Sequence, residues 1–262
     1  MTAQCIFVLH LTQFFLTLHN ALKLPFHFHL FTGHLFSSVV QTPPEVIVRS
    51  GQTFTLSCSH NISSYNTILW YYQHEHSQGM HIIGYSFHGT HNVENLDDKK
   101  YKLEGDAKNS VNLTISELTL KESAVYFCAA STHSAYFGNG TKLTVLDPDV
   151  TITEPTLKIL NTTRCKEKVT LVCVAENFYP DHVSIKWTLG DKEITEDVAT
   201  DPYATKDENT KMFNISSRLK VSKKEFTPKN TFRCTVTFNN STHVSEKTVY
   251  ITGTGGISLD IS

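Results

Sequence analysis

The chain has 262 residues, of which 40% are hydrophobic and 18% charged, and its 23 basic and 25 acidic side chains give a formal net charge of −2. Near neutrality excludes a protein that binds nucleic acid through phosphate neutralisation, which needs a clustered basic excess. An aromatic content of 11% argues against disorder, because enough apolar surface exists to offset chain entropy. At roughly 100–150 residues per domain, the length predicts two domains.

Residues 1–38 differ in composition from the rest of the chain. They hold long apolar runs and a single charged residue, Lys23. This composition predicts a secretory leader. The small residues Ser37 and Ser38 predict cleavage that leaves a mature start near Val39. No later window offers about 20 consecutive apolar residues, so no membrane-spanning helix is predicted within these 262 residues.

The cysteines that follow the leader also fit a secreted chain. Cys58 and Cys128 are 70 residues apart, Cys173 and Cys234 are 61 apart, and each interval brackets one small sandwich domain. No CxxC pair with matching histidines is present, which argues against a zinc site. Cys165 is left over, and it is either a free thiol on a loop or part of an intermolecular disulfide.

Short runs of alternating residues, separated by turn-forming residues, fill the chain after the leader. This pattern predicts an all-β sandwich. Alternate side chains on a strand share a face, so Cys58 and Cys128 both point inward, toward each other, across two packed sheets. A strand that carries Trp70 lies between them. The inward stripes are Phe54, Leu56 and Cys58; Ile68, Trp70 and Tyr72; and Ala124, Tyr126 and Cys128.

The same order of stripes recurs once, which predicts a second sandwich. The joint lies near Pro148, which lacks the N–H needed to continue a central strand. The expected domains are 39–146 and 147–252, followed by a short Gly/Ser tail at 253–262 that ends before any membrane segment. The inward stripes of the second domain include Val169, Leu171 and Cys173; Val183, Ile185 and Trp187; and Phe232, Cys234, Val236 and Phe238.

Several motifs in the first domain resemble those of an immunoglobulin variable domain. Tyr126 stands two residues before Cys128, the position of the tyrosine corner. The Phe-Gly-Asn-Gly-Thr run at 137–141, followed by Lys-Leu-Thr-Val-Leu, resembles a joining segment, which occurs in rearranged antigen receptors. The Trp-Tyr-Tyr-Gln run at 70–73 is similar to the variable-domain strand that faces a partner variable domain.

The second domain resembles the constant domain of a T-cell receptor beta chain, and the resemblance extends over residues 39–252. Glu122 stands where the family has Asp, which keeps the charge. The segment between Phe238 and Val249 is too short for the protruding loop of mammalian beta chains, which predicts a non-mammalian source. The motifs that carry the resemblance are Leu-Val-Cys at 171–173, Asn-Phe-Tyr-Pro-Asp-His-Val at 177–183, Thr-Asp-Pro at 200–202, Ser-Ser-Arg-Leu at 216–219 and Phe-Arg-Cys-Thr-Val-Thr-Phe at 232–238.

The resemblance implies two tandem immunoglobulin-like sandwiches, variable-type and then constant-type. It predicts disulfides from Cys58 to Cys128 and from Cys173 to Cys234, packed on Trp70 and Trp187. It also implies an antigen-recognition chain on the outer side of the plasma membrane. Such a chain pairs with an alpha chain, binds peptide presented by major histocompatibility molecules, and signals through associated subunits.

Two alternative functions stay open at this point. A secreted immunoglobulin light chain has a similar joining segment and Phe-Tyr-Pro motif, but the Thr-Asp-Pro and Ser-Arg-Leu elements favour the T-cell receptor. A two-domain adhesion or regulatory receptor of immunoglobulin type would have no rearranged segment, so the joining motif argues against it.

Tyr71, Gln73, Phe127 and Phe137 form the predicted partner face. They fall on the face opposite the inward Trp70, Tyr126 and Cys128, where a monomer would expose three aromatic rings together. Such a patch marks a partner surface. Gln73 is expected to exchange amide hydrogen bonds with a glutamine of the partner chain.

Three loops of a variable-type sandwich gather at one end, and they form the expected recognition surface. The loop from Ala129 to Tyr136 is short, so it can reach a shallow ligand without folding over it. His133 is the bulky side chain near its apex and the expected binding anchor. The expected recognition residues are Asn61, Tyr65 and Asn66; Phe87 and His88; and Ser131, Thr132, His133 and Ser134.

N-x-S/T sequons occur along both domains and support secretion. Asn139 is expected to stay free of sugar because it lies beside the partner face. The expected glycosylation sites are Asn61, Asn112, Asn161, Asn214 and Asn240.

Catalysis and cofactor binding are not predicted. The sequence contains no nucleophile elbow, phosphate loop or His-Glu-x-x-His motif. His74, His76 and His81 are close in sequence, but they lack carboxylate or thiolate partners at ligand spacing. We therefore expect solvated loop histidines there and no metal.

Overall fold

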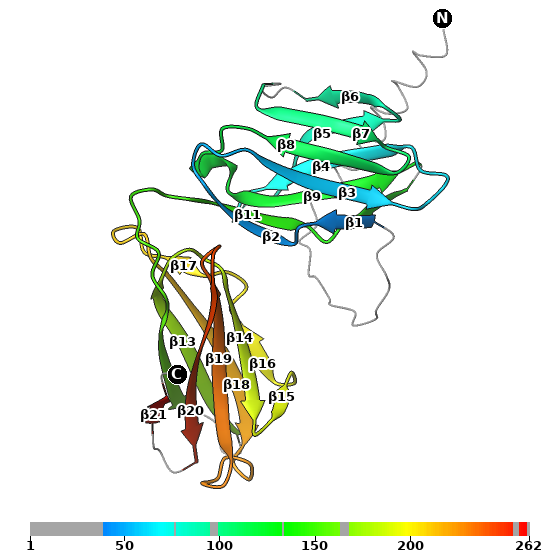
Figure 1. Ribbon diagram of the computed structural model, residues 1–262. Coiled ribbons are helices and arrows are strands. Elements are labelled where there is room, and N and C mark those ends of the chain that lie inside the picture. The colour runs from blue at the N-terminus through cyan, green and yellow to red at the C-terminus, as the bar shows by residue number, and fades with distance from the viewer. Residues whose placement is uncertain are drawn as a thin grey trace, which may run out of the picture. The chain divides into compact units, whose positions relative to one another are not determined.

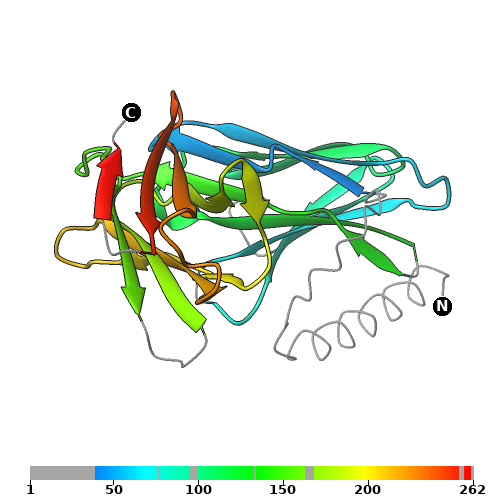
Figure 2. The ribbon, with the colours of Figure 1, turned by 90° about the horizontal axis from the view of Figure 1, so that it is seen from below.

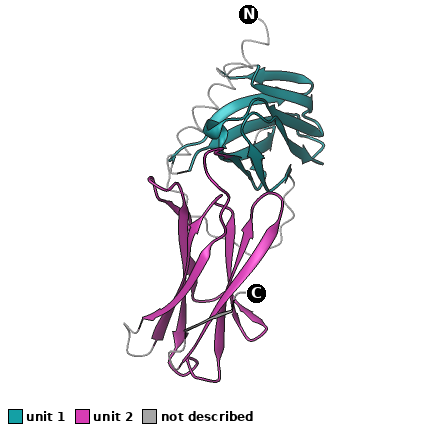
Figure 3. Ribbon diagram, turned by 60° about the vertical axis from the view of Figure 1, so that its left-hand side comes forward, with its two compact units in different colours: residues 1–145 teal, residues 146–262 magenta. Residues whose placement is uncertain are grey.

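The computed structural model describes residues 39–75, 77–94, 99–132, 134–162, 168–253 and 257–260. The chain divides between Val145 and Leu146 into two compact units (Figure 3). Both units consist of β-strands, and the first also contains a 3₁₀ turn, η1 (Leu120–Glu122). Within the described residues, no helix has the length and apolar character needed to cross a membrane.

The first unit is a sandwich of two sheets (Figure 1). One sheet has four strands in the order β1-β3-β8-β7, and the other has seven in the order β2-β11-β9-β4-β5-β6, with β10 paired to β9. The strands are β1 (Val39–Thr42), β2 (Glu45–Arg49), β3 (Phe54–His60), β4 (Thr67–Gln73), β5 (His81–Phe87), β6 (Thr90–Val93), β7 (Tyr101–Asp106), β8 (Ser110–Ile115), β9 (Ala124–Ser131), β10 (Ala135–Phe137) and β11 (Thr141–Leu146).

A disulfide between Cys58 and Cys128 joins the two sheets of the first unit. Both cysteines and Trp70 are fully buried, as the alternation on their strands predicts. Burial of each large apolar side chain in this core stabilises the fold by about 1.5–3 kcal/mol. The core also includes Leu56, Ile68, Ile83, Val111, Leu113, Ile115, Leu118 and Tyr126.

The turn before β9 holds Tyr126 in place. Its hydroxyl donates to the carbonyl of Glu122 at 2.8 Å, which forms the predicted tyrosine corner. The Glu122 carboxylate in turn accepts from the backbone N–H and the hydroxyl of Thr119 at 2.7 and 2.8 Å and pairs with Lys100 at 3.0 Å. The capping box therefore fixes the backbone from which β9 starts.

The second unit is also a sandwich of two sheets. One has the order β12-β13-β18-β16, with β17 paired to β18, and the other the order β15-β14-β19-β20-β21. The strands are β12 (Thr156–Thr162), β13 (Lys168–Phe178), β14 (Val183–Leu189), β15 (Lys192–Ile194), β16 (Val198–Thr200), β17 (Thr205–Lys206), β18 (Phe213–Ser222), β19 (Thr231–Asn239), β20 (Val244–Thr252) and β21 (Ile257–Asp260).

The core of the second unit repeats the plan of the first. A disulfide joins Cys173 to Cys234, and Trp187 is 1% exposed. The indole Nε1 of Trp187 donates to Ser217 Oγ at 2.9 Å. Large buried side chains beside it are Phe178, Leu171, Leu219, Phe232 and Phe238.

The segment expected to be a tail contains a strand. β21 pairs antiparallel with β20, from Ile257 opposite Ile251 to Asp260 opposite Thr248 (Figure 2). Without β21, this stretch of β20 would be the edge of its sheet, with unpaired backbone groups that attract another strand. The backbone of β20 therefore explains why 257–260 adopts an extended conformation.

Candidate functional site

The strand register of the seven-stranded sheet brings the three expected recognition loops together. Thr67, the first residue of β4, pairs with Phe87 at the end of β5 and with Ser131 at the end of β9. The loops that follow Phe87 and Ser131 therefore leave the sheet beside the loop that leads into Thr67. We call the segments 61–66, 87–89 and 131–136 the recognition loops.

Hydrogen bonds and a ring contact connect these loops to one another. The Thr132 hydroxyl donates to the carbonyl of Ser64, and the His88 N–H donates to the carbonyl of Asn66 at 2.9 Å. The rings of Tyr65 and Tyr136 lie 6.0 Å apart. The structure thus brings the first loop into contact with both of the others. Asn61 and Ser134 are exposed, Phe87 is half-buried with its ring 4.4 Å from the ring of His88, and His133 lies outside the described residues.

The structure places Ser131 within β9, and its recognition role stays a prediction. Ser131 is only 5% exposed, because β9 extends through it and pairs there with Thr67 on one side and Ala135 on the other. The surface of the third loop is provided by Thr132, Ser134 and Tyr136, which are all exposed.

Tyr136 is an exposed aromatic side chain that was not singled out from the sequence. It is 53% exposed on β10, and its ring is tilted by 35° relative to that of Tyr65. Its neighbour Phe137 begins the joining motif. An aromatic residue between a loop of small side chains and a Phe-Gly pair is the signal that could have identified it.

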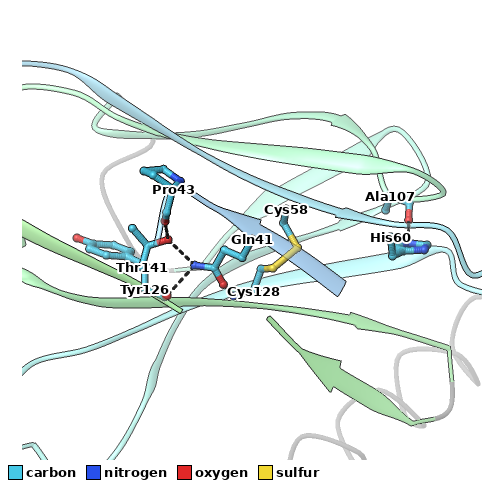
Figure 4. Close-up of a disulfide and its surroundings, with 8 residues drawn as sticks. All are labelled: Gln41, Pro43, Cys58, His60, Ala107, Tyr126, Cys128 and Thr141. Carbon is cyan, nitrogen blue, oxygen red and sulfur yellow. Dashed lines mark hydrogen bonds between the residues drawn. A yellow bond between two sulfur atoms is a disulfide. The ribbon is translucent and has the colours of Figure 1, made fainter. Parts of the chain in front are cut away.

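His60 holds the base of the first recognition loop, a role that was not predicted. Its Nε2 lies 2.8 Å from the carbonyl of Ala107, and its Nδ1 lies 3.2 Å from the N–H of Ile62 (Figure 4 draws the Ala107 bond). A carbonyl only accepts and a backbone N–H only donates, so the ring adopts the neutral Nε2–H tautomer. Ala107 also donates its N–H to the carbonyl of His88 at 2.8 Å. The inward alternation after Leu56 and Cys58 was the available signal.

The partner face is partly covered by the chain itself. Tyr71 pairs with Phe127 across β4 and β9, and its ring centre lies 6.0 Å from that of Phe137. Phe137 is 36% exposed, but Tyr71 is only 6% exposed, so the expectation of three exposed aromatic rings is wrong. Burial raises the pKa of Tyr71 to about 12. Tyr71 belongs to a small outer cluster with Leu69, Ala129, Met80, Ile82, Tyr85, Phe127 and Ala135.

Gln73 is hydrogen-bonded within its own chain. Its Nε2 donates to the carbonyl of Ser77 at 3.0 Å, which orients the amide at the end of β4. An exchange of amide hydrogen bonds with a glutamine of the partner chain stays a prediction. It would use the second N–H of the Gln73 amide and the amide oxygen.

Two glycines let the joining segment approach the rest of the sheet. Gly140 has a φ of +89°, and a Cβ at this position would lie 2.8 Å from the Phe127 ring. A Cβ on Gly138 would lie 2.8 Å from the Gln41 side chain and 3.2 Å from the Cys128 sulfur. Any larger residue at either position would displace the partner face or the disulfide.

Gln41 connects β1 to both β9 and the joining segment. This residue is 8% exposed, and its Nε2 donates to the Tyr126 carbonyl at 2.8 Å and to Thr141 Oγ1 at 3.0 Å (Figure 4). Its Oε1 accepts from the Cys128 N–H at 2.9 Å. All three bonds span 85 or more residues of sequence. Nothing local in the sequence signals such an interaction.

The second unit has an outer face that the sequence analysis did not assign. Leu160 pairs with Val172 on the outward side of the β12-β13-β18-β16 sheet and is 48% exposed. Val174, two residues along β13, is half-buried on the same side. Arg218 and Asp201 form an ion pair at 2.7 Å near these apolar side chains. We call Leu160, Val172 and Val174 the constant outer face.

The predicted glycosylation sites differ in exposure. Asn61, Asn112 and Asn161 are exposed. The Oδ1 of Asn214 accepts from the Asn177 N–H at 2.9 Å, and the Oδ1 of Asn240 accepts from the N–H groups of the residues two and three positions later at 3.0 and 2.7 Å. Asn139 is exposed between two buried glycines.

The histidines considered as metal ligands have other contacts. The Nδ1 of His74 lies 3.1 Å from the Ser123 carbonyl, and the rings of His74 and His81 lie 5.1 and 5.2 Å from the ring of Tyr72. His76 lies outside the described residues, as does Cys165. Across the described segments, no group of three or more His, Cys, Asp or Glu side chains is placed to hold a metal ion.

The comparisons with known proteins agree with the two-sandwich architecture. Residues 41–146 match the immunoglobulin V-set domain, and residues 156–241 match the immunoglobulin C1-set domain. The chain therefore carries the domain types of an immunoglobulin-type receptor, a V-set domain followed by a C1-set domain.

Relatives identify the family more closely. A viral T-cell receptor beta chain-like protein of feline leukemia virus is 34% identical over 79% of this chain and 68% of its own length. The constant region of the mouse T-cell receptor beta-2 chain is 43% identical over 36% of this chain, which spans 53% of that relative. A variable region of a mouse T-cell receptor beta chain is 36% identical over 41% of this chain and 82% of the relative. The chain belongs to the T-cell receptor beta-chain family.

Proposed function

We propose that this chain is the beta subunit of a T-cell receptor at the plasma membrane, where it pairs with an alpha chain and binds peptide presented by a major histocompatibility molecule. Signalling passes through associated membrane subunits, as the resemblance to the T-cell receptor beta chain implies. The observation that carries the proposal is that Thr132, His88 and Tyr136 connect the three recognition loops at one end of a V-set domain. A segment that resembles a joining segment completes the sheet of this domain.

The recognition loops suit a displayed ligand. Tyr65 and Tyr136 offer aromatic contact area at small entropic cost, and Thr132 and Ser134 offer hydroxyl groups. Because the third loop is a short hairpin, it supports contact with the surface of a ligand and not with a deep cavity. His133 remains the predicted central anchor at its apex.

Two surfaces support pairing with an alpha chain. In the first unit, Phe137 presents an exposed ring over the buried Tyr71, with Gln73 beside it. In the second unit, the constant outer face presents Leu160 and Val172 close to the Arg218–Asp201 ion pair. Apolar centres with polar surroundings are typical of protein interfaces.

Co-expression of the full chain with an alpha chain from the same source tests the pairing. Phe137→Asp places a carboxylate in the proposed apolar contact, and we expect the secreted heterodimer to fall about tenfold, since an unpaired buried charge costs at least about 1–3 kcal/mol. Val40→Asp is the matched control, because Val40 is 53% exposed on the opposite sheet. Equal heterodimer yields from the two variants would reject the partner face.

Binding of the resulting heterodimer to a panel of peptide-loaded histocompatibility molecules tests the recognition role. The recognition role is supported if a cell line that carries the heterodimer responds to one member of the panel. We expect His133→Ala to weaken binding of the heterodimer to that member by about 1–2 kcal/mol. A heterodimer that binds intact antigen without any histocompatibility molecule would indicate another kind of receptor.

A further inference from the structure

One glycosylation sequon lies within the recognition loops themselves. Asn61 and Ser63, the first and third residues of the sequon, are both exposed in the first loop. Between them, the Ile62 N–H donates to the Nδ1 of His60, and the Ile62 carbonyl accepts from the Tyr65 N–H at 3.0 Å. The backbone of the sequon is therefore fixed with both of its polar side chains toward solvent.

The Asn61 side chain differs in its contacts from those of two other sequon asparagines. The side-chain oxygens of Asn214 and Asn240 accept backbone hydrogen bonds. The Asn61 side chain is exposed and forms no hydrogen bond with the residues that the structure describes. An oligosaccharide on Asn61 would thus replace no contact of the folded chain.

The position of Asn61 places such a sugar at the rim of the recognition loops. On one side, the same loop bonds to Thr132 through Ser64. On the other side, His60 donates its N–H to the Asn109 carbonyl at 2.9 Å and its ring to Ala107, so the β7–β8 turn lies beside the base of the loop. Asn61 therefore belongs to a loop that contacts this turn at its base and the third recognition loop through Ser64 and Tyr65.

We propose that Asn61 carries an N-linked oligosaccharide that covers the first-loop side of the recognition surface. The inference rests on the proposed function only for its consequence, which is that ligand contact is displaced toward Thr132 and Tyr136. An N-linked glycan is bulky and strongly hydrated, so it excludes a macromolecular ligand from the surface around its attachment point.

The modification requires a lipid pyrophosphate-linked oligosaccharide, the donor class of the secretory pathway. The Nδ2 of Asn61 forms a bond to the anomeric carbon of the first sugar, while the bond from that carbon to the pyrophosphate oxygen breaks. The lipid pyrophosphate leaves with the bonding electron pair, and the amide loses one proton to a base. No oxidation or reduction takes place.

Glycopeptide mass spectrometry of the full chain, co-expressed with its partner in eukaryotic secretory cells, tests the modification. We expect the peptide that contains Asn61 to carry a glycan, and Asn61→Gln and Ser63→Ala each to lose the mass of one glycan. Ser63→Thr is the matched control, because it keeps the sequon and should keep the glycan. Unmodified Asn61 in the parent chain would overturn the proposal.

Hydroxyl-radical labelling tests the covering of the surface. We expect labelling of Tyr65 to rise about twofold in Asn61→Gln and Ser63→Ala, because the bulky sugar no longer screens it. Labelling should stay at the parent level in Ser63→Thr and in Asn112→Gln, which removes a sequon from the exposed side of β8. Equal labelling in all variants would refute the covering. Neither readout uses an antigen, so failure here differs from failure of the proposed function.

Discussion

The two core tryptophans differ in a single hydrogen bond. Trp187 donates to Ser217 Oγ, whereas Trp70 Nε1 is buried without a hydrogen-bond partner among the described residues. Ser217 pairs with Cys173 in the strand register, and Val111 pairs with Cys58 at the matching place in the first unit. The exchange of a serine for a valine opposite the cysteine therefore accounts for the unpaired indole.

Removal of the serine hydroxyl should weaken the second unit. We expect Ser217→Ala to lower its free energy of unfolding by about 1–3 kcal/mol, because the buried Trp187 N–H loses its acceptor. The Thr200 hydroxyl, 2.8 Å from Ser217 Oγ, loses its contact as well. Urea denaturation followed by tryptophan fluorescence measures the change. Ser184→Ala, at an exposed position of β14, is the control, and an equal effect of both variants would contradict the role of the bond.

Glu122 makes the stability of the first unit depend on pH. Burial raises the pKa of its carboxyl, but the bonds from Lys100 and Thr119 outweigh burial and lower the pKa below its ordinary value. A carboxyl whose pKa is lower in the folded state stabilises the fold above its unfolded-state pKa, and this contribution is lost as the pH falls through the folded-state pKa.

Glu122→Gln should therefore destabilise the first unit by about 1–2 kcal/mol near neutral pH, where it removes the ionised acceptor of the capping box. The difference from the parent chain should shrink as the medium is acidified below about pH 4. Urea denaturation at both pH values measures it. Glu104→Gln, which changes an exposed surface pair with Lys102, should have little effect at either pH.

The hairpin of β9 and β10 holds the first recognition loop through a hydrogen bond from Thr132 to Ser64. Thr132→Val keeps the shape of the side chain but removes the hydroxyl that bonds to Ser64. We expect hydrogen exchange in 61–66 to become faster, since one link between the loops is lost. Thr55→Val is the control, because it removes an exposed hydroxyl that bonds to Thr114 far along β3. Unchanged exchange in 61–66 would show that Tyr65 and Asn66 hold the loop without Thr132.

Alternation along single strands was enough to predict the elements around Cys58, Trp70 and Cys128 and their inward faces. It was also enough to place Phe137 on the outer side of its sheet. Alternation could not predict the burial of Ser131. This residue is buried because β9 continues far enough for it to pair with Thr67 and Ala135, and alternation does not show where β9 ends.

Contacts between distant segments were also beyond reach from the sequence. The covering of Tyr71 depends on Phe137, and the role of His60 depends on the carbonyl of Ala107. The pairing of 257–260 with β20 follows from the free edge of β20 and not from the composition of the tail. Each of these features requires knowledge of which segments meet in space.

At the scale of the whole molecule, each unit has its own core and its own disulfide. The two bonds close loops with sequence separations of 70 and 61 residues, and by chain-entropy estimates each stabilises its unit by about 4 kcal/mol. Because the cores are separate, loss of one disulfide should affect one unit.

Replacement of Cys173 and Cys234 by alanine should lower the unfolding free energy of the second unit by up to about 4 kcal/mol and leave that of the first unchanged. Differential scanning calorimetry, with hydrogen exchange to assign each transition, measures both units. The matching variant at Cys58 and Cys128 is the control and should reverse the pattern. A loss of both transitions in either variant would indicate that the units fold together.

The contacts of Gln41 have a consequence for how such receptors can vary. A joining segment is an interchangeable part, and it fits this variable domain only if a glycine stands where Gly138 admits the Gln41 side chain and a hydroxyl stands where Thr141 meets the Gln41 amide. The side-chain hydrogen bonds of Gln41 go to residues 126, 128 and 141, and to none of the described residues between Ser131 and Phe137. Gln41 is therefore a fixed contact for whichever joining segment is used. Residues 138–141 must stay compatible with this contact, whereas the loop ahead of Phe137 can differ between receptors without changing it.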